Sequence, residues 1–231
     1  MKKDNGYKNY VNYFKKWEGC ATLGIILAAI GFLMLWLGLS YFSYILAIIL
    51  MPGGLALFLY GSIGRANESD LQSIAERKKA NLVFPEIEET DLARYNHRAV
   101  EKFEEMVFEG FVLRDGLMIK TQKNGTACSS EYTVAKMRIY ADRLWIRGLT
   151  FSFTEEAETC FEHTVALADL KDATVERDRR TVTGSNRRRV LGKFCHLVLT
   201  LADGTELRLL AKDDIYTDEF AQGLLRRRDA K

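Results

Sequence analysis

The chain has 231 residues, of which 28% are charged and 48% hydrophobic, and its net charge is +2. Such averages are typical of a globular protein of one or two domains, and a nearly neutral chain argues against a broad basic surface for nucleic acid. Four cysteines without CxxC spacing argue against a zinc-ribbon type of metal site. They favour a reducing compartment, although two of the three cysteines in the polar part of the chain could also form one disulfide.

The charged residues are distributed unevenly, because residues 19–64 contain none. A straight helix of this length would measure about 70 Å, more than twice the ~30 Å hydrocarbon thickness of a bilayer. Two crossings of about 20 residues fit, with a reversal at Gly38, Leu39 and Ser40. A cleaved signal peptide is the alternative, but its apolar region would be only about 7–15 residues long. Residues 19–64 are therefore predicted to form a transmembrane helical hairpin.

The residues that flank this run predict its orientation. Aromatic side chains lie where a hairpin would meet the two interfaces: Trp17 and Tyr60 at one, and Trp36, Tyr41, Phe42 and Tyr44 at the other. Basic residues lie on both outer sides and are missing from the reversal: Lys2, Lys3, Lys8, Lys15 and Lys16 precede the run, and Arg65, Arg77, Lys78 and Lys79 follow it. This asymmetry predicts a multi-pass protein of the cytoplasmic membrane with both termini in the cytoplasm, and makes residues 1–18 a basic, aromatic cytoplasmic tail.

A helical connector is predicted at residues 65–110. The first part is a polar helix over about 65–79, which Pro85 separates from the second part. Apolar residues then recur at spacings of three and four, with Thr90 as a plausible N-cap and Gly110 as a stop. These apolar residues are Leu92, Tyr95, Ala99, Phe103, Met106 and Val107.

From Phe111 onward the hydrophobic period becomes two and turn dipeptides recur, which is typical of antiparallel strands. Strands are predicted at 111–114, 117–122, 131–140, 143–153, 159–165, 173–182, 189–202 and 205–211, with a turn of helix at 167–171. The chain then ends in an amphipathic helix with Tyr216, Phe220 and Leu224 on one face. Acidic residues lie in or before its first turn and arginines in its last, which suits the helix dipole. The fold class predicted is an α+β membrane protein.

The segments MRIYADRLWIRG, TVALADLKDATVER, FCHLVLTLADGTELRLL and DEFAQGLLRRR occur in this order. In this order they resemble the bacterial pleckstrin-homology-like (PH-like) and GRAM-like domains. The resemblance covers residues 111–228. It implies an antiparallel PH-like barrel or sandwich with a C-terminal capping helix. It also implies a binding or scaffolding module. Because the sequence lacks catalytic and cofactor-binding motifs, no enzymatic activity and no cofactor are expected.

A basic stretch, residues 177–193, is the candidate site with the clearest physical mechanism. It reads RDRRTVTGSNRRRVLGK and has a local net charge of +6. Its cations are the lipid- or anion-binding candidates Arg177, Arg179, Arg180, Arg187, Arg188, Arg189 and Lys193. Beside a membrane anchor they could contact anionic head groups; a solvated hairpin tip whose charges prevent edge pairing is the equal alternative. The acidic stretches 86–91 and 155–162 argue against nucleic acid as the partner.

Catalytic candidates are few among the three histidines. His97 is expected on the polar side of the connector, and His196 on the face opposite the core. His163 is expected to point inward with Phe161 and Val165, so the alternative function is a membrane-anchored enzyme with a site around His163, using Glu162 or Cys160. The sequence contains no HExxH, GxSxG or glycine-rich phosphate loop, and no metal site is predicted. The expected partners are membrane lipids and an unknown protein, and a homo-oligomer is left open.

Overall fold

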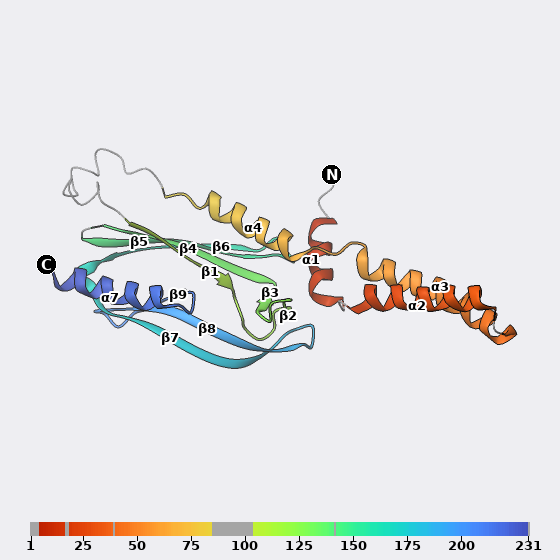
Figure 1. Cartoon of the computed structure of the whole chain (residues 1–231). Coiled ribbons are helices and arrows are strands. Elements are labelled where there is room, and N and C mark those ends of the chain that lie inside the picture. Colours follow the sequence, from red (N-terminus) through yellow and green to blue (C-terminus); the bar gives the residue numbers. More distant parts are fainter. Residues whose placement is uncertain (1–4, 17–18, 39, 85–103, 141, 231) are drawn as a thin grey trace. The chain divides into compact units, whose positions relative to one another are not determined.

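The computed structural model describes residues 5–16, 19–38, 40–84, 104–140 and 142–230 (Figure 1). The chain divides into two compact units, Met1–Asn67 and Glu68–Lys231. The first unit is helical, and the second contains antiparallel sheets together with helices. The chain is therefore an α+β protein, as the sequence predicts.

Two apolar helices, α2 (Gly19–Leu37) and α3 (Tyr41–Ser62), make up most of the first unit. Their mean hydropathies are 2.4 and 2.2, and both are long and apolar enough to cross a bilayer. The predicted reversal falls between them. Gly38 there has a φ of 58°, which glycine adopts without strain. The Ser40 hydroxyl caps α3 by accepting a hydrogen bond from the backbone N–H of Ser43.

Buried glycines line the contact between α2 and α3. Gly24 and Gly31 are seven residues apart in α2, and Gly54 and Gly61 are seven apart in α3. A Cβ atom added at Gly54 would lie 2.5 Å from the backbone nitrogen of Ala28, and one at Gly24 would meet the backbone of α3 at 2.4 Å. These distances are too short for any side chain, so the close approach of the two helices depends on glycine.

The predicted tail contains a helix, α1 (Asn5–Lys15), which the sequence analysis did not anticipate. Tyr13 and Phe14 near its end are 1% and 0% exposed. The Lys16 ammonium group donates a hydrogen bond of 2.6 Å to the carbonyl oxygen of Tyr60, in the last turn of α3. A lysine at this place satisfies a carbonyl group that the helix itself leaves without a partner.

The larger sheet of the second unit has the strand order β1-β4-β5-β6, with every neighbouring pair antiparallel. Its strands are β1 (Glu104–Phe111), β4 (Glu131–Ile139), β5 (Arg143–Ser152) and β6 (Glu158–Ala166). The strands predicted at 131–140, 143–153 and 159–165 are therefore confirmed.

The helix predicted to end at Gly110 is wrong for residues 104–110, which pair with β4 as strand β1. The rest of that prediction, residues 90–103, lies outside the described residues. Met106 and Phe108 alternate in β1 and both contact the main core, so their spacing has the period of a strand. Gly110 does not end a helix; a Cβ atom there would lie 2.4 Å from the Leu210 side chain, so glycine lets β1 approach β9 closely.

A short hairpin, β2 (Ile119–Thr121) with β3 (Ala127–Ser129), follows β1. It turns at Gly125, which has a φ of 82°, a conformation that glycine adopts without strain. The strand predicted at 117–122 is confirmed in its central residues. The strand predicted at 111–114 is wrong beyond Phe111, because β1 ends there.

The smaller sheet has the order β7-β8-β9 and is also antiparallel. Its strands are β7 (Leu170–Thr183), β8 (Arg189–Leu201) and β9 (Glu206–Leu210). The helical turn η1 (Leu167–Asp169) precedes β7, and helix α7 (Ile215–Asp229) follows β9, both where the sequence predicts them.

One hydrophobic core joins both sheets to α7. Its buried residues include Phe108, Met137, Ile146, Leu197 and Leu224, and Phe220 of α7 packs against it as predicted. Tyr216, which was predicted on the same face of the helix, is 72% exposed and does not belong to the core. Among the described residues the strands form three separate hydrogen-bonded sheets and no closed barrel.

Helix α4 (Glu68–Asn81) confirms the polar helix predicted at 65–79 and lies against the larger sheet (Figure 1). Leu71 in α4 is 1% exposed. Phe84, just beyond the helix, packs edge-on against Trp145 of β5, with ring centroids 5.1 Å apart. These contacts make α4 part of the second unit and not a free connector.

Candidate functional site

The basic stretch forms the β7–β8 hairpin, and strand pairing divides its cations between two faces. Residues directly opposite each other in an antiparallel pair share a face, and successive residues in a strand alternate. Arg179 is opposite Lys193, and Thr183 is opposite Arg189. Arg179, Arg189 and Lys193 therefore lie on one face, and Arg180 lies on the other.

Contacts with the segment after β1 hold the tip of this hairpin in place. The Asn186 side-chain amide donates a hydrogen bond of 2.7 Å to the carbonyl oxygen of Ile119, and the backbone N–H of Ser185 donates one of 2.9 Å to that of Leu117. Gly184 is buried, and a Cβ atom there would lie 2.5 Å from Ile119. The tip of the hairpin is therefore docked on this segment. The solvated tip, which the sequence allowed as an alternative, is not what the structure has.

Arg177 is the basic candidate that the structure removes from the anion-binding set. Its guanidinium donates two hydrogen bonds, of 3.0 and 2.6 Å, to the carboxylate of Asp218 in α7, and one of 2.6 Å to Asp213. The hydrogen bonds to Asp218 and then to Asp213 raise the pKa of Arg177, and the arginine lowers the pKa of Asp218. The role of Arg177 is therefore to join β7 to α7.

Three other cations, Arg179, Arg189 and Lys193, lie on one face of the hairpin. We call this surface the basic face and include in it Leu191, which lies between Arg189 and Lys193 on β8. All four residues are exposed, and Leu191 keeps 62% of its surface accessible. Within the described part of the chain, none of the three cations is in salt-bridge contact with a carboxylate. The result is an uncompensated positive surface with one apolar side chain at its centre.

Two further candidates, Arg187 and Arg188, occupy the turn itself. Arg187 is exposed and has a φ of 59°, the left-handed region that is uncommon for residues other than glycine. Arg188 is half-buried, and its carbonyl oxygen accepts a hydrogen bond of 2.9 Å from Gly184. Arg187 therefore extends the positive surface to the tip, whereas Arg188 contributes mainly to the turn.

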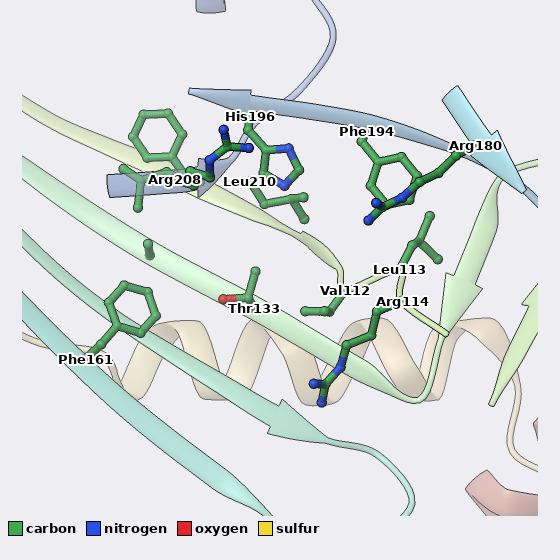
Figure 2. Close-up of a pocket in the computed structure, with 13 residues that line it drawn as sticks. Val112, Leu113, Arg114, Thr133, Phe161, Arg180, Phe194, His196, Arg208 and Leu210 are labelled. Atoms are coloured by element: carbon green, nitrogen blue, oxygen red, sulfur yellow. The ribbon is translucent and has the colours of Figure 1, made fainter. Parts of the chain in front are cut away.

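Arg180 belongs to a different environment, an open cavity of about 290 Å³ that is lined by residues of the two sheets and of the segment after β1. Figure 2 shows Phe194 and His196 extending from β8 into this cavity, with Thr133 and Phe161 on the opposite side. The Arg180 guanidinium lies over the Phe194 ring, 4.6 Å from its centroid. Arg180 and Phe194 therefore form one wall of the cavity.

His196 lies on the other face of β8 from the core residues Leu197 and Leu199, as predicted, but this face is not open to solvent. Its imidazole is half-buried and stacks on Phe194, with ring centroids 6.4 Å apart and an interplanar angle of 15°. Burial lowers the pKa of His196, and Arg208 and Arg180 lower it further, against an opposite effect of Glu176. These effects favour the neutral form of the ring.

The proposed catalytic alternative is not assembled in the structure. His163 is opposite Ile146 and so lies on the core-facing side of the sheet, yet it is exposed, because β6 is an edge strand. The expectation that it is buried is wrong. Cys160 is also exposed, and the Glu162 carboxylate accepts a hydrogen bond of 2.8 Å from the indole N–H of Trp145. Alternation along β6 places Cys160 and Glu162 on the face opposite His163.

The cavity residues Arg180, Phe194 and His196 were not recognised together from the sequence. Arg180 was grouped with its basic neighbours, and His196 was assigned to a face without a function. Alternation in β7 and β8 was the available signal, because it separates Arg180 from Arg179 and puts Phe194 and His196 on a common face.

No family model matches the chain, and no curated protein matches it.

Proposed function

We propose that the chain is an integral membrane protein in which α2 and α3 anchor a cytoplasmic binding module, and that the basic face of this module contacts anionic lipid head groups. The observation that carries this proposal is the uncompensated positive charge of Arg179, Arg189 and Lys193 around an exposed Leu191.

The surfaces of α2 and α3 support a membrane anchor. Their large apolar side chains point outward: Phe32 is 63% exposed, Trp36 78%, Phe42 72% and Ile48 65%. The core helix of a soluble protein would bury such residues, because burial of apolar surface is worth about 25 cal/mol per Å². A bilayer provides this apolar environment. Basic residues on both outer sides of the hairpin favour the cytoplasm for the rest of the chain.

The short link between anchor and module favours contact with the same membrane. Residues 63–67 are all that separates the end of α3 from the start of α4, and an extended chain of this length spans about 20 Å. Because α4 is packed on the larger sheet, it cannot unravel to lengthen the link without losing the buried contacts of Leu71.

The chemistry of the basic face suits an anionic leaflet. Each lysine or arginine close to such a surface contributes about 1 kcal/mol, within a Debye length of about 8 Å at physiological salt. Leu191 can enter the head-group region while Arg179 and Lys193 meet phosphates, since arginine and lysine both bind phosphate groups. The hydrogen bonds of Ser185 and Asn186 hold the turn of this hairpin in place.

The resemblance of the sequence to bacterial PH-like domains is the basis for proposing a binding module. If the β2–β3 hairpin is set aside, four antiparallel strands are followed by three more and then by a helix. By that resemblance the module binds or scaffolds and is not an enzyme. A protein partner for the basic face is the other outcome of the test below.

Vesicle binding of the fragment 68–231 tests the proposal. Vesicles with anionic lipid should bind the fragment at low salt and release it at high salt, and neutral vesicles should not bind it. Replacing Arg179, Arg189 and Lys193 together by glutamine should weaken binding by up to about 100-fold.

The matched control replaces three exposed lysines elsewhere in the fragment, Lys123, Lys171 and Lys212, by glutamine and changes the net charge equally. If both triple variants lose binding to the same extent, net charge alone attracts the fragment to vesicles and the basic face has no specific role. If anionic vesicles do not bind the fragment at low salt, a protein partner is the better assignment.

A further inference from the structure

A cavity that is open to solvent lies between the two sheets and measures about 290 Å³. Its apolar lining comes from Phe108 and Leu209, which are buried, and from Leu113, Phe194 and Leu210. The volume is at the lower end of the range in which proteins bind small molecules, about 300–1,000 Å³.

The charged residues at the cavity are arginines, and no carboxylate lines it. Two of the three arginines are neutralised. Arg114 makes two hydrogen bonds to Glu131, of 2.8 and 2.9 Å, and Arg208 forms ion pairs with Glu176 and Glu206. Figure 2 shows Arg114 directed away from the cavity.

Arg180 is the arginine whose charge is not balanced. In the part of the chain that the structure describes, its guanidinium makes no ion pair and lies over the face of Phe194. Stacking on an aromatic ring fixes the plane of a guanidinium and leaves its N–H groups directed outward along that plane. One guanidinium held in this way at an apolar cavity matches a single negative charge.

His196 adds one polar group to the lining of the cavity, next to Phe194. It stacks on the same Phe194 ring and, as a neutral imidazole, carries one N–H that can donate a hydrogen bond. A dianionic phosphate would call for more free positive charge than one arginine provides, and a sugar for more hydrogen-bonding groups. A flat carboxylate accepts two parallel hydrogen bonds from a guanidinium.

We infer that this cavity binds a small amphiphilic carboxylate, an apolar chain or ring that ends in one carboxylate group, with the carboxylate on Arg180 and His196 and the apolar body among Leu113, Phe194 and Leu210. The site is independent of the basic face, because Arg180 lies on the opposite side of β7 from Arg179. It gives the module a soluble ligand in addition to the lipid surface proposed above.

Three probes with the same apolar body test this inference: 3-phenylpropionate, its neutral amide, and the cationic 3-phenylpropylamine. Each is titrated into the full chain in nanodiscs of zwitterionic lipid, with empty nanodiscs as the blank for partitioning. The side-chain NMR signals of the histidines report binding. His196 is assigned by the loss of its signal in His196→Gln, and His163, which is exposed on β6, serves as the internal reference.

The carboxylate should shift the His196 signal in a saturable manner and leave that of His163 unchanged. The amide should bind at least about tenfold more weakly, because the hydrogen bond between two charged groups is lost. The amine should not bind, because it brings a second positive charge to Arg180. Arg180→Gln should weaken binding of the carboxylate at least about tenfold, and the matched control Arg179→Gln, one residue away on the opposite face, should not.

Three results would overturn the inference: no shift of His196 with the carboxylate, equal affinity for carboxylate and amide, or equal weakening by Arg180→Gln and Arg179→Gln. Arg180 is exposed and makes no ion pair within the described residues, so its replacement leaves the fold intact; an unchanged thermal midpoint verifies this. If the midpoint falls, the comparison of the three probes on the unaltered chain still decides the question.

Discussion

Packing of the C-terminal helix against the sheets can be tested by Leu224→Ala. Leu224 is 1% exposed and belongs to the core cluster that joins both sheets to α7. Removing its isobutyl branch leaves a cavity among those residues, and such changes cost about 2–5 kcal/mol. For a unit of this size, each kcal/mol lowers the thermal midpoint by about 2–4 °C, so the expected decrease is about 4–20 °C.

The assay is thermal unfolding of the fragment 68–231, followed by circular dichroism. Gln222→Ala, at an exposed position of the same helix, is the control and should change the free energy of unfolding by no more than about 0.5 kcal/mol. Equal decreases for the two variants, or no decrease for Leu224→Ala, would show that α7 is not packed into the core.

Three further predictions concern the ion pair, the helical hairpin and the topology. Arg177 lowers the pKa of Asp218 below the ordinary 3.8, so the ionised carboxylate stabilises the folded state above that pH. The thermal midpoint of wild type should therefore exceed that of Asp218→Asn at pH 7, and the difference should disappear as the pH falls below about 3.8. Gly54→Val should lower the thermal midpoint of the full chain in detergent, because an added Cβ atom would overlap the backbone of α2, whereas Gly53→Val, with no atom within 4 Å, should not; similar midpoints for both would refute the glycine contact. A cysteine at Ser40 should react with an impermeant maleimide on intact cells and the exposed Cys160 only after lysis, and labelling of Cys160 without lysis would reverse the proposed topology.

The strands that the sequence predicts correctly are those whose turns are local. Asn124-Gly125 and Asp203-Gly204 each reverse the chain at a glycine with positive φ, and the alternating residues on either side fix the strands. Strand β1 was missed because Met106 and Val107, at spacings of three and four from Phe103, fit a helix as well as a strand. Only its pairing with β4, 20 or more residues later, resolves the ambiguity.

The candidate site was predicted as a stretch and not as a surface. Seven neighbouring cations were treated alike, although the pairing of Arg179 with Lys193 already implies that Arg180 faces the other way. The contact of Arg177 with Asp213 and Asp218 joins residues 36 and 41 positions apart and depends on where α7 packs. No local pattern encodes that contact, so the number of available cations could not be obtained from the sequence.

The central claim is that the basic face contacts the anionic head groups of the membrane in which α2 and α3 are anchored. A fluorophore on Leu191→Cys, with the native cysteines replaced by serine, reports this contact in the full chain when the nanodisc lipids carry a quencher on their head groups. Quenching should be strong in nanodiscs with anionic lipid and weak in zwitterionic ones, and a fluorophore on Gln222→Cys of α7 should be quenched weakly in both. Equal quenching at the two positions, or none at Leu191→Cys with anionic lipid, would contradict the claim.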